Sequence, residues 1–254
     1  MKVLAGIKIV NLAANLPGPA AAQRLSRMGA NVIKIEAPAG DPMEIYSADW
    51  YRDMAAGHTV VRLDLKLPAG KEILLDLLSS ADVLITATRP AAMERLGLGP
   101  AALQQKFPRL CQTIIVGYPA PRDNEAGHDL TYQASMGLID PPHMPRTLLS
   151  DMAGAERAVS STLALLFNRE RSGVGGHDIV ALSEAAEAFA EPLRYGSTVS
   201  GASLGGGIPE YNIYRTADGW VAVAALEPHF KQRLEGALNI STPEEYRAAF
   251  AGQS

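Results

Sequence analysis

The sequence has almost no cysteine. Cys111 is the single cysteine among 254 residues, which excludes a disulfide within the chain and is typical of a reducing compartment. It lies in an apolar run, residues 110–116, that is typical of a buried strand. Because free cysteines are usually buried, we predict that Cys111 is a core residue and not a nucleophile.

Long apolar runs are also missing. No stretch reaches the ~20 apolar residues that a membrane-spanning helix needs, and no basic segment followed by an apolar core marks a signal peptide. The formal net charge is only −4, which argues against general nucleic-acid binding. We therefore expect a soluble, cytoplasmic protein with neither a membrane nor a nucleic acid as its partner.

Metal and dinucleotide motifs are absent as well. The five histidines are scattered and show no metal-ligand spacing. No Gly-x-Gly-x-x-Gly follows a predicted strand, and the glycine run 205–207 lacks the lysine and serine or threonine of a phosphate loop. We therefore predict no metal, no NAD and no nucleotide hydrolysis.

Apolar runs alternate with helical patterns through most of the chain. The predicted strands cover residues 7–12, 31–35, 59–63, 82–85, 110–116 and 178–182. The predicted helices cover residues 19–28, 69–78, 100–107, 152–171 and 184–195. Buried strands joined by helices predict an α/β fold with a parallel sheet that helices cover on both faces.

The composition changes near residue 197. A glycine-rich stretch, residues 201–207, precedes two short strand patterns at 211–214 and 220–224. The Asp218-Gly219 pair between them predicts a hairpin. We therefore predict a large domain over residues 1–197 and the start of a small domain over residues 198–254.

Three short motifs carry candidate chemistry. They are Gly127-His128-Asp129-Leu130, Ser150-Asp151-Met152 and Leu226-Glu227-Pro228. Histidine has a pKa near neutrality and suits proton transfer, whereas aspartate needs burial or a second carboxylate to act as an acid at pH 7. A plainer interpretation is helix capping, by Asp129, Asp151 and Glu227, and the bare sequence favours it for Asp151 and Glu227.

These motifs and several others resemble the class III CoA-transferase family (CaiB/BaiF-like). The matching runs are residues 4–10, 16–19, 28–36, 40–42, 63–66, 81–85, 89–90 and 94–99. The order Gly-His-Asp-Leu-x-Tyr, Tyr-Arg-Thr-Ala-Asp-Gly and Leu-Glu-Pro-x-Phe is most similar to the α-methylacyl-CoA racemase branch. The resemblance implies a Rossmann-like large domain, a smaller second domain, and an interlocked homodimer whose active site lies at a domain and subunit junction.

The resemblance also implies roles for individual residues. His128 and Asp151 match the acid/base pair, and Glu227 matches the acid that supports the histidine. The substrate would be an acyl-CoA, with no cofactor beyond its CoA moiety. CoA carries phosphates that need cations, and the CoA-binding candidates are Lys34, Arg62, Lys66, Arg89, Arg95, Asp129 and Tyr132.

Three functions follow as hypotheses. The first is a racemase or epimerase of 2-methylacyl-CoA thioesters with His128 and Asp151 as its two bases. The second is a CoA-transferase in which Asp151 is the nucleophile, and the third is a non-catalytic member of the family. The third is motivated by Ala37 and His58, which stand where relatives carry cations, and by a second domain expected to be shortened at Ser254.

Overall fold

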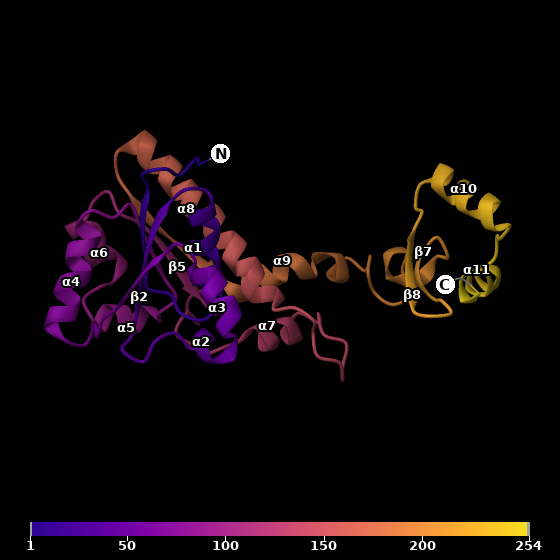
Figure 1. Cartoon of the computed structure of the whole chain (residues 1–254), viewed down its shortest axis with the longest axis horizontal. Coiled ribbons are helices and arrows are strands. Elements are labelled where there is room, and N and C mark those ends of the chain that lie inside the picture. Colours follow the sequence, from indigo (N-terminus) through magenta and orange to yellow (C-terminus); the bar gives the residue numbers. More distant parts are fainter. Residues whose placement is uncertain (1, 253–254) are drawn as a thin grey trace. The chain divides into compact units, whose positions relative to one another are not determined.

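The computed structural model describes residues 2–252 and contains a six-stranded parallel sheet (Figure 1). The strands are β1 (Lys8–Asn11), β2 (Asn31–Glu36), β3 (Thr59–Arg62), β4 (Val83–Thr86), β5 (Cys111–Val116) and β6 (Gly176–Ala181). They lie in the order β3-β2-β1-β4-β5-β6. The chain adds strands toward one edge up to β3 and then, from β4, toward the other edge, as in a Rossmann fold. The predicted α/β fold and its parallel sheet are confirmed.

Nine helices surround or follow these strands in the described part of the chain up to residue 194. They are α1 (Pro17–Arg27), α2 (Met43–Tyr46), α3 (Ala48–Ala55), α4 (Pro68–Ser79), α5 (Pro90–Arg95), α6 (Pro100–Lys106), α7 (Asp129–Ser135), α8 (Leu149–Ser172) and α9 (Leu182–Arg194). The helices α1, α4, α6, α8 and α9 were predicted. The other four have four to eight residues each, too few for a clear helical period.

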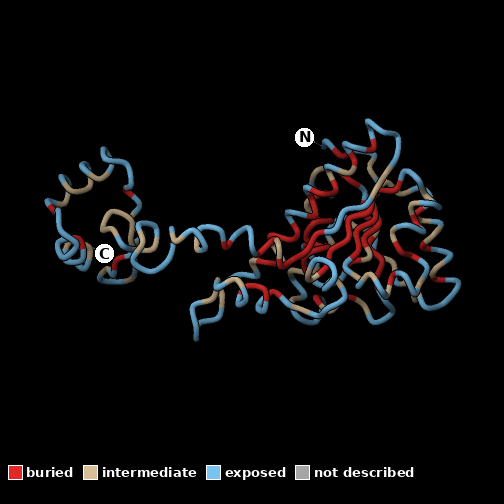
Figure 2. The backbone as a smooth tube through the Cα atoms, turned by 180° about the vertical axis from the view of Figure 1, so that it is seen from behind, coloured by how far each residue is buried: buried red, intermediate tan, exposed pale blue. Residues whose placement is uncertain are grey.

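Alternate side chains along each strand point to opposite faces of the sheet and build two cores. On one face, Ile9 packs with α1 and α8. On the other face, Val10 packs with α4, α5 and α6. Cys111 is fully buried on the first face, as predicted, and burial raises the pKa of its thiol. Figure 2 shows that the inner strands of the sheet are the most deeply buried part of this region.

The chain divides into two compact units, residues 1–188 and residues 189–254, with the division inside α9. The domain break predicted near residue 197 stays a prediction. The second unit contains the π-turn η1 (Ser203–Gly207), β7 (Tyr211–Arg215), β8 (Trp220–Ala224), α10 (Pro228–Leu238) and α11 (Pro243–Ala251). The predicted hairpin is present as the antiparallel pair β7–β8.

The second unit has a small core of its own. Tyr214, Ile240 and Tyr246 are buried together, and the Tyr214 ring stacks on Phe250 with 5.0 Å between centroids. No helix within residues 2–252 is both long and apolar enough to cross a membrane.

Candidate active site

Two pockets open at the carboxyl ends of the strands in the first unit. The larger has a volume of about 790 Å³ and is lined by residues that follow β1, β4 and β5 and by the starts of α7 and α8. The smaller, of about 600 Å³, is lined by residues that follow β1, β2 and β3. Ligands of Rossmann-like folds bind at this edge, where the strand order reverses. We call the two cavities the His128 pocket and the Glu36 pocket.

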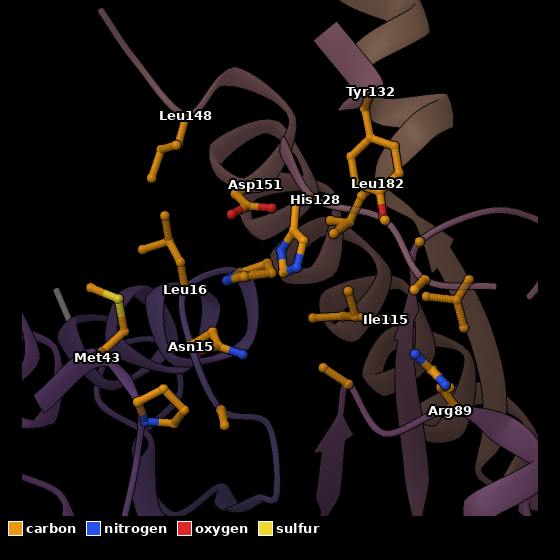
Figure 3. A pocket seen from close by; sticks show the side chains of 18 of the residues that line it. Asn15, Leu16, Met43, Arg89, Ile115, His128, Tyr132, Leu148, Asp151 and Leu182 are labelled. Carbon is orange, nitrogen blue, oxygen red and sulfur yellow. The ribbon is translucent and has the colours of Figure 1, made fainter. Parts of the chain in front are cut away.

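His128 lies at the start of α7 and faces the larger pocket (Figure 3). Its backbone is fixed by Thr131, whose hydroxyl donates to the His128 carbonyl at 2.7 Å and accepts from the His128 N–H at 3.2 Å. The helix start therefore presents the imidazole at a defined position while the side chain itself stays exposed to the cavity.

Asp151 faces the same pocket from the first turn of α8. Because α8 begins at Leu149, Asp151 is the third residue of the helix. The capping role that the bare sequence favoured for Asp151 is therefore wrong. Asp151 instead directs a half-buried carboxyl group into the cavity that also holds the imidazole of His128.

Asp129, the first residue of α7, connects the start of that helix to the start of α8. Its side chain is buried, one oxygen accepts from the Asp151 N–H at 3.1 Å, and the other accepts from Gln133 Nε2 at 2.5 Å. Gln133 Nε2 also donates to the Thr147 carbonyl at 3.0 Å. Asp129 does not line the pocket and instead holds the backbone of Asp151 in place. Its predicted part in CoA binding stays a prediction.

The surroundings of Asp151 change its acidity. Burial, and then the charge of Asp129, raise the pKa of Asp151 from 3.8 to about 7. At neutral pH this carboxyl group is therefore divided between its protonated and ionised forms, so it can both give and take a proton. Partial burial next to a second, buried carboxyl group is thus what adapts this aspartate to acid–base chemistry.

Tyr132 closes the inner end of the pocket. It is fully buried, packs edge-to-face on Tyr118 at 5.2 Å, and burial raises the pKa of its phenol to about 12. A Cβ on Gly117 or on Gly127 would lie 2.4 Å from its hydroxyl oxygen. The two glycines are therefore required by the ring, which holds the loop that leads to His128. Its predicted contact with CoA stays a prediction.

The two predicted arginines lie differently. Arg89 precedes α5 and lines the His128 pocket with an exposed side chain. Arg95, in the last turn of α5, is exposed and lines neither of the two pockets. Within the described residues the structure therefore brings Arg89, and not Arg95, to the cavity that holds His128 and Asp151.

Lys34 is buried away from both pockets. Its ammonium pairs with Asp41 at 2.5 Å and Glu36 at 3.0 Å, and it lies 4.6 Å from the centroid of the Tyr51 ring. A buried ammonium with two carboxylate partners is a structural ion pair, and a ligand phosphate would have to displace one of them. The predicted contact of Lys34 with CoA has no support in this arrangement.

The cations near the Glu36 pocket are few. Lys66 lines it and is exposed, and Arg62 pairs with Glu44 at 3.3 Å beside the pocket residue Gly40. Ala37 lines the same pocket without a charge. Burial, and then the charge of Lys34, lower the pKa of His58 to about 4, so that histidine is neutral at pH 7.

Glu227 belongs to the other unit. It precedes α10, where its side chain is exposed and makes no capping hydrogen bond. The predicted support of His128 by Glu227 stays a prediction, and so does the absence of a metal or NAD. Among residues 2–252, no group of three or more histidine, cysteine and acidic side chains is placed to hold a metal ion.

Part of the pocket wall was not predicted. Met43, Tyr46 and Trp50 line it from α2 and α3, and Asn15 lines it from the turn after β1. The motif Gly40-Asp41-Pro42 marks the segment before α2, but four- and eight-residue helices leave too short a pattern to show which side chains face the cavity.

Comparisons with known proteins match the chain to one family. The model of CoA-transferase family III matches residues 4–254. Human α-methylacyl-CoA racemase is 32% identical in an alignment of 259 positions that covers 95% of this chain and 66% of the racemase, so the chain spans just under two thirds of that relative. A probable fatty acyl-CoA transferase of Mycobacterium tuberculosis is 29% identical over 92% of this chain and 68% of its own length.

Solved structures show the same fold. The crystal structure of the mycobacterial protein superposes with a TM-score of 0.84 at 27% identity, covering 99% of this chain and 80% of that one. A CaiB/BaiF family protein from Brucella suis gives a TM-score of 0.80 at 25% identity, covering 94% of this chain and 70% of that one.

Proposed function

This chain belongs to CoA-transferase family III, and from that premise we propose that it is a racemase of 2-methylacyl-CoA thioesters. The observation that carries the proposal is that His128 and Asp151 line one pocket and that the pKa of Asp151 is raised to about 7. A carboxyl group of that acidity in the same cavity as an imidazole matches the two-base chemistry, because each side chain can serve as a general acid or base.

In the proposed reaction the neutral imidazole of His128 takes the α-proton of the thioester and leaves an enolate. The protonated carboxyl group of Asp151 then delivers a proton to the opposite face of the same carbon, and the configuration is inverted. For the other enantiomer, the Asp151 carboxylate removes the proton and the imidazolium of His128 returns one. Each direction ends with one proton on the pair, so the next turnover runs from the mirror-image state.

The substrate is proposed to occupy both pockets. The nucleotide would lie in the Glu36 pocket with Lys66 and Arg62 near its phosphates, and the acyl group in the His128 pocket with Arg89 at the side. We also propose, on the family resemblance, that Glu227 supports the imidazole and that the chain forms a homodimer; sedimentation equilibrium measures the latter directly.

A CoA-transferase is the second candidate. It is favoured by the same carboxyl group of Asp151 facing a cavity, and by relatives of that name, including a succinate–glutarate CoA-transferase of Agrobacterium fabrum at 30% identity over 93% of this chain and 66% of its own length. In that reaction Asp151 would attack the thioester carbonyl as a nucleophile and CoA would leave. His128 would then have no role as a base.

The decisive experiment follows the α-carbon. A single enantiomer of a 2-methylacyl-CoA is incubated with the protein in D₂O, and we expect α-deuterium together with a racemic product. His128→Ala and Asp151→Asn should each reduce this exchange by roughly 10²–10⁴, the usual effect of one positioned acid or base. His143→Ala is the matched control, because His143 is exposed and does not line the pocket.

Other outcomes separate the alternatives. Transfer of CoA to a free acid, with hydroxylamine marking Asp151 and no α-deuterium, would establish the transferase. Full exchange in His128→Ala would remove His128 from the mechanism. Absence of any CoA-thioester binding by calorimetry would leave the non-catalytic family member.

A further inference from the structure

The turn between β1 and α1 has an unusual backbone conformation in the wall of the His128 pocket. Asn15 has a φ of 63° and so occupies the left-handed region, which non-glycine residues seldom adopt. Such conformations persist where the surroundings hold them, and they are frequent at ligand sites. The question is what holds Asn15 there and what its side chain reaches.

A buried ion pair holds the backbone of Asn15. The N–H of Asn15 donates to Asp41 Oδ1 at 3.0 Å, and the same oxygen accepts from the Met43 N–H at 3.0 Å. The other oxygen of Asp41 pairs with Lys34 at 2.5 Å, and only 3% of Asp41 is exposed. The Lys34–Asp41 pair therefore fixes the turn after β1 to the loop after β2.

The turn lies where the two pockets adjoin. Ala14 lines both the His128 pocket and the Glu36 pocket, and Asn15 lines the former. In Figure 3 the Asn15 side chain faces the cavity below His128. A ligand that fills both pockets has to pass over this turn.

The carboxamide of Asn15 is available to such a ligand. Within residues 2–252 its side-chain oxygen and nitrogen have no hydrogen-bond partner, since Asn15 bonds only through its backbone. A carboxamide offers two donors and an acceptor, which is complementary to a secondary amide. In a CoA thioester, the segment between the nucleotide and the acyl group is the pantetheine arm, and it carries two secondary amides.

We propose that Asn15 binds the pantetheine arm of the thioester through its side-chain carboxamide, and so contributes to recognition of the carrier rather than to proton transfer. The inference rests on the proposed function, because it takes the ligand to be a CoA thioester. Asn15 would act on the bound ground state and the transition state alike, which raises KM when it is lost and leaves kcat unchanged.

A simpler explanation for an asparagine at this position is that it tolerates a positive φ. Asn15→Gly separates the two explanations, because glycine adopts this conformation without strain and removes only the carboxamide. Asn15→Ala removes the same group but adds the strain of a Cβ in the left-handed region. We expect both variants to lose binding and only the alanine variant to unfold at a lower temperature.

The measurement is calorimetric binding of three probes to the full chain: pantetheine, CoA and 3′,5′-ADP. In Asn15→Gly we expect the Kd for pantetheine and for CoA to rise by roughly three- to tenfold, the size of one hydrogen bond, and the Kd for 3′,5′-ADP to stay the same. In the exchange assay, KM should rise by a similar factor at constant kcat.

Unchanged pantetheine and CoA binding in Asn15→Gly would overturn the inference and leave the racemase proposal intact. Equal weakening of 3′,5′-ADP would also overturn it, since the effect would then be a general change of the turn. If the unsubstituted protein bound none of the three probes, the proposed function and the inference would both fail.

Discussion

Two groups of acidic side chains lie near the carboxyl ends of the same sheet. They differ in whether a buried cation neutralises their charge. In the first group, Glu36 and Asp41 share the ammonium of Lys34. In the second, Asp129 and Asp151 adjoin each other, and within residues 2–252 neither forms an ion pair with a cation. Asp129 instead accepts hydrogen bonds from the Asp151 N–H and from Gln133.

The difference separates structural acids from chemical ones. A carboxylate paired with a buried cation fixes the backbone around it, as Asp41 fixes the turn at Asn15. A carboxyl group buried beside a second acid is held near its protonation midpoint, as shown by the pKa of about 7 for Asp151. The ion pair that fixes the backbone therefore lies beside the Glu36 pocket, and the carboxyl group with the raised pKa lies in the His128 pocket.

The largest expected effect comes from removing the cation shared by Glu36 and Asp41. Lys34→Met should lower the free energy of unfolding by about 3–5 kcal/mol, because Asp41 would remain buried without a cation and Glu36 would keep only its pair with Arg62 at 3.6 Å. Urea denaturation measures the change. Lys106→Met is the matched control, since Lys106 is exposed, and it should change stability by no more than about 0.5 kcal/mol.

An equal and small loss in Lys34→Met and Lys106→Met would contradict this account of Lys34. The ion pair would then contribute no more than a surface charge does, and Lys34 would again be a candidate for binding ligand phosphates.

The sequence predicts the sheet well because its strands carry apolar runs that are independent of tertiary contacts. Residues 110–116 and 82–85, for example, become the fully buried strands β5 and β4. The motif around His128 and the position of Asp151 were also available from the order of residues, since both follow the family pattern. These features are local.

The features that were not predicted depend on contacts between distant segments. The role of Lys34 depends on Asp41 and Tyr51, which the fold brings to it from the loop after β2 and from α3. The start of α8 depends on Asp129, 22 residues earlier, which accepts the Asp151 N–H. The conformation of Asn15 likewise depends on Asp41, 26 residues later. Contacts between such distant residues cannot be predicted from the periodicity of the sequence.

The second prediction concerns Asp151 and stability. In the folded protein the pKa of Asp151 is about 7, above the ordinary value of 3.8. Between about pH 4 and pH 7, Asp151 is therefore protonated in the folded state and ionised in the unfolded state. Its contribution to stability therefore falls as the pH rises from about 4 to about 7 and is constant above. Asp151→Asn lacks this dependence, so its stability relative to the unsubstituted protein should rise by about 4 kcal/mol across that window, at about 1.4 kcal/mol per pKa unit.

Urea titrations of both proteins at pH 4, 5.5, 7 and 8.5 measure the difference. A difference that is the same at every pH would show that Asp151 titrates alike in the folded and unfolded chains, and the acid–base role proposed for it would lose its physical basis.

The smallest effect distinguishes the two causes of the raised pKa of Asp151. Asp129→Asn removes the neighbouring charge but leaves the burial, which is the larger cause, so the pKa of Asp151 should fall while staying above its ordinary value. In the direction of exchange where Asp151 donates the proton, the loss of rate at high pH should then begin at a lower pH. Asp123→Asn is the matched control, because Asp123 also lines the pocket but is not among the groups that shift Asp151. If both variants kept the unsubstituted pH profile, burial alone would account for the acidity of Asp151, and Asp129 would serve only to join α7 to α8.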